Sequence, residues 1–288
     1  MSELEHVITS FSFEKLDDNR FRSRSPDFGW RRIYGGLLLA HAVRAAQLDI
    51  GDSDRQPHSL HGYFLRPGNV EEPLDIVMER NLDGRTIANR GIRIEQSGKA
   101  VFIAQCSFRT PGAGLSHQCP MPHAESPESL PDEAQVAQLN SQTLSTSAQT
   151  YLRRPKVFEL RPVNHGLFVK PDPDDSASSL IWARLRSAGT VSDELVWPLM
   201  AYLSDMTVLN ASLHPHGRNF FDDDIVMASL DHAVWFHGLP DWSDWVLMSH
   251  EAMGNDSGMG LGRTNIHSRK GGLLATVVQQ GLIRQKID

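Results

Sequence analysis

Three polar side chains stand inside apolar segments of this sequence, where they could take part in chemistry. One is Asp205, which follows the apolar stretch 195–203. At about 100° per residue of a helix, this aspartate lies beside Tyr202 at the edge of the apolar face. A carboxylate next to a buried apolar face needs a hydrogen-bond or ion-pair partner, or it has a functional role such as accepting a proton. On these residues alone, an ordinary aspartate at the surface edge is the simpler interpretation.

The other two polar candidates lie in predicted strands. Side chains alternate along a strand, so Ser229 and Asp231 share one face and His232 lies on the other. For Ser229 the plain alternative is an ordinary strand hydroxyl, and Asp231 with His232 could be a hydrogen-bonded structural pair. Alternation also means that one of Gln279 and Gln280 points to the packed or pocket side. A buried glutamine amide must find partners for two donors and one acceptor.

The elements that must position these residues follow from hydrophobic periodicity. Residues 33–46 are uniformly apolar and predict a buried helix entered through Gly35 and Gly36. Residues 1–33 predict short strand pieces around Phe11–Phe13 and Phe21. After the helix, the pattern changes to long strands of an antiparallel meander, at 58–68, 74–82, 86–95 and 100–108.

The second half of the chain repeats this order. Between the halves, residues 111–148 are rich in Pro, Ser, Gln and Glu and predict a linker, with a short helix near 132–139. A helix then starts at 192–194, and Pro198 either belongs to its first turn or kinks it. Strands are predicted at 157–163, 180–186, 225–236, 245–252, 262–269 and 273–284. Residues 59–66 match 229–236 at a spacing of about 170, which indicates an internal duplication and an α+β fold.

Composition excludes several classes of protein. The 288 residues are 40% hydrophobic and 22% charged, so the chain is globular rather than disordered. The net charge of −7 argues against a nucleic-acid partner, which requires a basic surface. Only Cys106 and Cys119 are present, so neither a disulfide scaffold nor a cysteine-built metal site is expected. Residues 1–20 contain no secretory signal and no apolar run could span a bilayer, so we expect a cytoplasmic protein.

The common catalytic and cofactor motifs are missing. There is no Gly-x-Ser-x-Gly nucleophile elbow and no Walker loop. The glycine-rich stretch 258–262 lies between predicted strands and is better explained as a hairpin turn. His214-Pro215-His216 lacks the spacing of a ligand pair on a helix, and Asp222–Asp224 is better explained as a solvated turn. We therefore predict no metal and no cofactor.

Six motifs in register nevertheless resemble the acyl-CoA thioesterase II (TesB-type) family over nearly the whole chain. They are the Tyr-Gly-Gly helix entry and the segments 63–68, 201–205, 214–217, 229–237 and 278–281. The resemblance implies a double hotdog, with two antiparallel sheets each wrapped around a central helix and joined by a linker. The corresponding domains are 1–112, a linker at 113–150, and 151–288. It further implies an acyl-CoA substrate and a homo-oligomer.

The family's catalytic set falls, by motif match, on Asp205, Ser229 and Gln279. Ser229 stands where the family has threonine, so the hydroxyl is kept and a methyl group is lost. The implied reaction is hydrolysis of fatty acyl-CoA to a free fatty acid and CoA. Asp205 would accept a proton from a water that Ser229 and Gln279 hold.

Supporting contacts are less specific in the sequence. The N–H groups at Gly35 and Gly36 could stabilise an oxyanion, or the two glycines could serve close packing of the helix against the sheet. Arg66 is a candidate substrate contact, and Arg90 and Arg284 are further candidates for CoA phosphates.

Two alternative functions keep the same fold. One is a hotdog enoyl-CoA hydratase that uses Asp231 and His232, and the other is a non-catalytic acyl-CoA binding protein.

Overall fold

A computed structural model describes residues 1–29, 32–163, 168–169, 178–186 and 191–286. The chain forms two compact units, and it passes between them more than once. The first unit comprises Met1–His117, Thr190–Met206 and Leu230–Leu239. The second comprises Gln118–Gly189, Thr207–Ser229 and Pro240–Asp288. The predicted domain limits at 112 and 150 stay a prediction.

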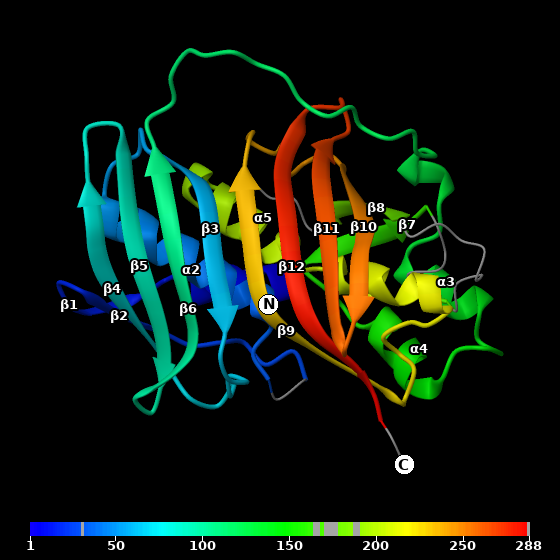
Figure 1. Ribbon diagram of the computed structural model, residues 1–288. Helices are drawn as coiled ribbons and strands as arrows, with labels where there is room; N and C mark the ends of the chain where they lie inside the picture. Colours follow the sequence, from blue (N-terminus) through cyan, green and yellow to red (C-terminus); the bar gives the residue numbers. More distant parts are fainter. Residues whose placement is uncertain (30–31, 164–167, 170–177, 187–190, 287–288) are drawn as a thin grey trace. The chain divides into compact units, whose positions relative to one another are not determined.

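The first unit is built on antiparallel strands in the order β1-β2-β4-β5-β6-β3-β9 (Figure 1). The long strands of the predicted meander are confirmed to within a few residues. Strand β9 (Ile225–Phe236) enters this unit with residues 230–236. The others are β1 (Glu14–Asp17), β2 (Arg20–Ser23), β3 (Gln56–Phe64), β4 (Leu74–Asp83), β5 (Ile87–Gln96) and β6 (Lys99–Arg109).

Two helices pack together on this sheet. Helix α2 (Gly35–Ile50) contacts β3, β4, β5 and β6 on one side and α5 (Val196–Ser204) on another. Contact on several sides explains why its residues from Gly36 to Val43 are all buried, as the apolar run predicts. A short 3₁₀ helix, η3 (Asp193–Leu195), precedes α5 and begins after Ser192. Pro198 lies in the first turn of α5, where a missing N–H is tolerated.

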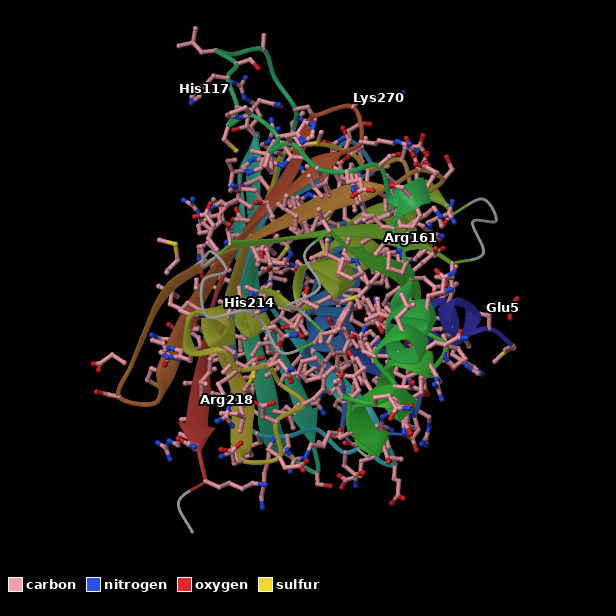
Figure 2. All side chains as sticks on the ribbon, turned by 90° about the vertical axis from the view of Figure 1, so that its right-hand side faces the viewer. Glu5, His117, Arg161, His214, Arg218 and Lys270 are labelled. Atoms are coloured by element: carbon pink, nitrogen blue, oxygen red, sulfur yellow. The ribbon has the colours of Figure 1, made fainter. Side chains whose placement is uncertain are left out.

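The beginning of the chain corrects one prediction. A strand was expected around Phe11–Phe13, but helix α1 (Glu3–Ser10) ends there, and Phe11 is its C-cap. A capping box explains the helix, because Ser2 accepts from the Glu5 N–H and the Glu5 carboxylate accepts from the Ser2 N–H. Glu5 is exposed at the surface (Figure 2), whereas Leu4, Val7 and Phe11 are buried. The predicted strand at Phe21 is confirmed as β2.

The second unit contains strands in the order β9-β12-β11-β10-β8-β7. Residues 225–229 of β9 belong to this second unit. The neighbouring strands from β12 through β11, β10 and β8 to β7 pair antiparallel. A 3₁₀ helix, η4 (Val208–His216), lies against β10, β11 and β12. These strands are β7 (Phe158–Pro162), β8 (Ser178–Leu185), β10 (Val246–Asp256), β11 (Met259–Ser268) and β12 (Leu273–Gln285).

The segment predicted as a linker has structure of its own. It contains η1 (Pro127–Ser129), α3 (Glu133–Leu139) and α4 (Thr146–Arg153). Helix α3 confirms the short helix expected near 132–139, while α4 was not predicted. Within the described ranges, no helix has the length and apolarity needed to cross a bilayer.

The end of α2 is tied to the sheet by a buried ion-pair network. The Asp49 side chain is 1% exposed and pairs with Arg80 at 2.6 Å and Arg90 at 2.5 Å. Arg90, itself 3% exposed, also pairs with Asp83 at 2.6 Å. This carboxylate therefore joins the last turn of α2 to strands β4 and β5.

Replacing Asp49 with alanine should lower the free energy of unfolding by about 3 kcal/mol, because it leaves the Arg90 guanidinium buried without its main counter-charge. Urea unfolding followed by far-UV circular dichroism measures the change. The matched control is Asp18→Ala, since the Asp18 side chain is 93% exposed and its pair with Lys15 should contribute little. Equal stabilities for the two variants would contradict this account.

Candidate active site

Asp205 is the C-cap of α5, and its side chain is only 6% exposed. The helical pattern predicted a position at the edge of the apolar face, and the structure encloses the carboxylate more than that pattern suggests. The chain then turns sharply, because Thr207 adopts a left-handed conformation with φ 65° before η4 begins. A β-branched residue rarely adopts this conformation, so the turn after Asp205 is strained.

The Asp205 carboxylate lies against the first residue of α2. A Cβ atom placed on Gly35 would be 2.8 Å from Asp205 Oδ2 and 3.0 Å from the Phe64 ring. The first N–H groups of a helix have no acceptor within the helix, and they form its positive end. The start of α2 therefore favours negative charge on Asp205.

Gly36 brings the backbones of α2 and α5 together. A Cβ atom there would be 2.4 Å from the Tyr202 carbonyl oxygen and 2.4 Å from the Tyr34 ring. The Tyr34 hydroxyl donates to the same carbonyl at 3.2 Å, and the two tyrosine rings meet edge to face. Gly36 therefore serves close packing, but against α5 and not against the sheet as predicted. The oxyanion role stays a prediction.

His232 of β9 is a neighbour of Asp205 that the sequence did not connect to it. Its side chain is fully buried, with Nε2 2.9 Å from Ser204 Oγ and Nδ1 3.9 Å from Asp205 Oδ1. The neighbouring Asp231 is partly exposed and pairs in register with Tyr63 of β3. The predicted alternation of Asp231 and His232 is confirmed. The two side chains face different sides of the strand.

Ser229 and Gln279 are brought together in the second unit. Gln279 Nε2 donates to Ser229 Oγ at 2.8 Å, although the residues are 50 positions apart in the chain. Gln279 is 1% exposed and Gln280 is partly exposed, so Gln279 is the inward-facing member of the pair. Gly262 lies opposite Gln279 in the strand register. A Cβ on Gly262 would be 2.6 Å from the Val208 carbonyl oxygen, so η4 comes very close to β11 here.

The predicted catalytic residues thus form two groups. Asp205 belongs to the first unit, and the Ser229–Gln279 pair belongs to the second. Asp205 and Ser229 each lie beside a point where the chain passes from one unit to the other, after residues 206 and 229. The joint action of the three side chains stays a prediction.

The three arginine candidates differ in their surroundings. Arg66 is exposed, and its Nη1 donates to the Ala100 carbonyl oxygen at 2.7 Å. Arg90 is buried in the network with Asp49 and Asp83, so it serves the fold and cannot contact a CoA phosphate there. Arg284 is exposed near the end of β12.

His214, one of the two histidines considered as metal ligands, and His250 beside it are buried. His214 is buried in η4, and the described residues contain no group of three side chains suited to hold a metal ion. His250 is fully buried, and burial, together with a smaller effect of nearby His214, lowers the pKa of its imidazole to about 3. Its two nitrogens contact Thr207 Oγ1 at 2.9 Å and Thr264 Oγ1 at 2.6 Å. This neutral imidazole helps to hold the strained turn at Thr207.

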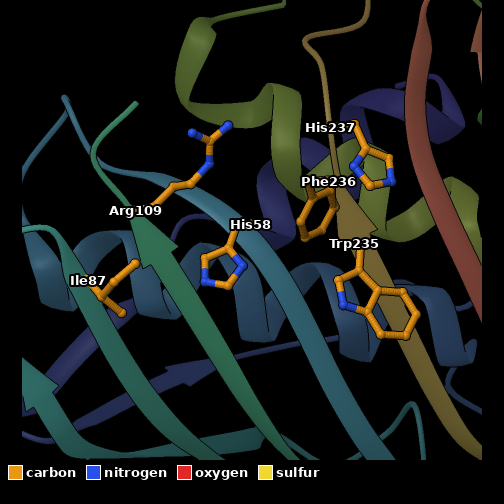
Figure 3. Close-up of a pocket in the computed structure, with 6 residues that line it drawn as sticks. All are labelled: His58, Ile87, Arg109, Trp235, Phe236 and His237. Atoms are coloured by element: carbon orange, nitrogen blue, oxygen red, sulfur yellow. The ribbon is translucent and has the colours of Figure 1, made fainter. Parts of the chain in front are cut away.

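A hollow of about 350 Å³ opens in the first unit (Figure 3). One of its imidazoles, His58, lies 2.9 Å from Ser107 Oγ. Partial burial and the nearby Arg109 guanidinium lower the pKa of His58, so that ring is neutral at pH 7. None of the predicted catalytic side chains lines this hollow. Its lining residues are His58, Ile87, Arg109, Trp235, Phe236 and His237.

Antiparallel strands packed on a buried helix, with an enclosed carboxylate at the helix start, fit a hotdog-type scaffold. Family models described as acyl-CoA thioesterase and acyl-CoA thioesterase N-terminal domain match residues 174–282 and 22–109. The chain is 32% identical to acyl-CoA thioesterase 2 of Haemophilus influenzae, over 98% of both chains. The chain therefore belongs to the acyl-CoA thioesterase II (TesB-type) family, and it is a thioester hydrolase.

Solved structures agree with this assignment. Acyl-CoA thioesterase II TesB2 from Mycobacterium marinum is similar with a TM-score of 0.78 and 28% identity, covering 97% of this chain and 98% of that one. A hot dog fold protein from Alicyclobacillus acidocaldarius has a TM-score of 0.74 at 18% identity, covering 98% of each chain, and supports the fold alone. The resemblance inferred from the motifs is thereby confirmed.

Replacing Gly36 with alanine should lower the free energy of unfolding by about 2 kcal/mol, because the added methyl group would push α2 away from the Tyr202 carbonyl. Thermal unfolding followed by circular dichroism measures the loss. Gly112→Ala is the control, since among the described residues other than its chain neighbours no atom lies within 4 Å of a Cβ at that position. If Gly36→Ala is as stable as the control, the close contact of the two helices is not a constraint.

Proposed function

We propose that this protein hydrolyses fatty acyl-CoA to a free fatty acid and CoA by direct attack of water. A thioester carbonyl is already activated, and the leaving thiolate belongs to a thiol with a pKa of about 8.5. Little help from a general acid is therefore needed. The protein must hold the water, accept its proton and stabilise the oxyanion.

Asp205 is the proposed general base. The start of α2 favours its carboxylate form, and enclosure of the side chain keeps bulk water from competing for the proton. The water oxygen bonds to the carbonyl carbon while one water proton passes to Asp205. The C–S bond then breaks, and CoA leaves as a thiolate that takes up a proton.

Ser229 and Gln279 are proposed to hold the attacking water. Their hydrogen bond at 2.8 Å is the observation that carries this proposal, because it joins two polar side chains from separate segments of the chain. Ser229 Oγ accepts from Gln279, so its own hydroxyl hydrogen is directed elsewhere and can donate to a water or a carbonyl. Such a fixed pair reduces the loss of freedom when the water binds.

The remaining substrate contacts are proposals of the same kind. The N–H groups at Gly35 and Gly36 would face the oxyanion at the start of α2. Arg66 is exposed and uses one nitrogen on Ala100, so other N–H groups of its guanidinium could contact CoA. A homo-oligomer in the cytoplasm, without a cofactor, is the proposed working form.

Asp205→Asn should lower kcat by at least about a hundredfold, since the amide cannot accept the water proton. Release of free thiol from acyl-CoA measures turnover, and turnover of the parent enzyme should also fall on the acid side as the carboxylate takes up a proton. Asp231→Asn is the control, because that side chain lies on the other side of β9 from His232 and should be dispensable. Turnover of Asp205→Asn within a few-fold of the parent would rule out this base.

The hydratase alternative is tested with an enoyl-CoA. A loss of enoyl absorbance in the presence of the parent enzyme, without release of thiol, would favour hydration over hydrolysis.

Ser229→Ala should lower kcat by about tenfold or more, whereas Ser229→Thr keeps the hydroxyl and should stay within about threefold of the parent. Gln279→Ala should resemble Ser229→Ala, because each removes one end of the same hydrogen bond. Gln280→Ala provides the matched control on the other face of β12. Full activity in Gln279→Ala would show that the pair does not hold the water.

A further inference from the structure

A buried imidazole of β9, His232, lies beside the end of α5, and the proposed reaction does not yet use it. Ser204 is fully buried, the Asp205 side chain is 6% exposed, and the His232 side chain is 0% exposed. His232 therefore touches the proposed base inside the first unit, away from bulk water. The question is what this enclosed imidazole does beside the carboxylate of the proposed base.

The hydrogen bonds of Ser204 determine where the His232 ring carries its proton. The Ser204 hydroxyl has one hydrogen, which it donates to the Ala201 carbonyl oxygen at 2.8 Å. Ser204 Oγ must then accept from His232 Nε2, which lies 2.9 Å away. The neutral ring is therefore the Nε2–H tautomer, and its Nδ1 has a lone pair.

That lone pair is placed to respond to the charge of Asp205. Nδ1 lies 3.9 Å from Asp205 Oδ1, while the other carboxylate oxygen lies against Gly35. An ionised carboxylate offers no hydrogen to Nδ1, and the distance is longer than a hydrogen bond. Once Oδ1 takes a proton, the new O–H can donate to Nδ1 after the two atoms approach by about 1 Å.

We propose that His232 is a positioning residue for Asp205, which stabilises the protonated carboxyl formed when water gives up its proton. The inference rests on the proposed role of Asp205 as the base. The O–H bond of water breaks, its oxygen bonds to the carbonyl carbon, and the proton stays on Asp205 Oδ1. His232 takes up no proton and acts only as a hydrogen-bond acceptor.

The surroundings of His232 suit this role. The residue opposite it on β3 is Gly62, which has no side chain. A Cβ on Gly62 would clash with the Phe102 ring, which shows how closely apolar groups pack there. Asp231 faces the other side of the strand and cannot take the place of Asp205.

Two substitutions separate this role from a purely structural one. In His232→Gln, the side-chain amide can reach Ser204, but nothing replaces Nδ1. In His232→Asn, the amide oxygen can occupy the Nδ1 position, but the bond to Ser204 is lost. We expect kcat to fall by at least about tenfold in the glutamine variant with KM within about twofold, and the asparagine variant to retain more of kcat.

A structural anchor predicts the opposite order, with glutamine near the parent and asparagine impaired, and that order would overturn the inference. A double-mutant cycle with Asp205→Asn adds a second test. If His232 acts through Asp205, then adding His232→Gln to Asp205→Asn should lower kcat by less than about twofold. A full tenfold further loss contradicts the inference. A fully active Asp205→Asn single variant would instead refute the proposed base, so the two failures are distinguishable.

Discussion

The position of Asp205 depends on the close backbone contact between the start of α2 and the end of α5. Gly36 allows the two backbones to meet at the Tyr202 carbonyl, where a Cβ atom would have only 2.4 Å. Because Asp205 follows directly as the C-cap of α5, its carboxylate must lie at the start of α2. Burying a carboxylate is costly, and the positive helix end offsets part of that cost.

The second unit uses glycine in the same physical way. Gly262 and Gly281 lie where η4 approaches the strands, and a Cβ on Gly281 would be 2.3 Å from the Leu209 side chain. Gln279 lies between these contacts, two residues before Gly281 and opposite Gly262 in the register. Gln279 is 1% exposed, so its bond to Ser229 is made away from bulk solvent. Each unit therefore combines a backbone contact at glycine with an enclosed polar side chain.

The helices and strands were largely predictable because the spacing of apolar residues differs between the two kinds of element. The uniformly apolar run at 33–46 and the alternating strands after it correspond to α2 and to β3–β6. Helix α1 was not predicted, because the aromatic residues at its end favour a strand, whereas the Ser2–Glu5 capping box stabilises a helix. Arg90 was misjudged for a different reason. Its partner Asp49 lies 41 positions away, and strand alternation states the face of a residue but not its partner.

The sequence by itself determined which residues are polar within apolar elements, and its motifs identified the family. It also predicted that one of Gln279 and Gln280 faces inward, since alternation depends only on local geometry. Only the tertiary structure decided that Gln279 is the buried one and that it bonds Ser229. The pairing of His232 with Ser204 and Asp205 was likewise beyond the sequence. Such contacts depend on strand register and on the distance between helices, which packing over the whole unit sets.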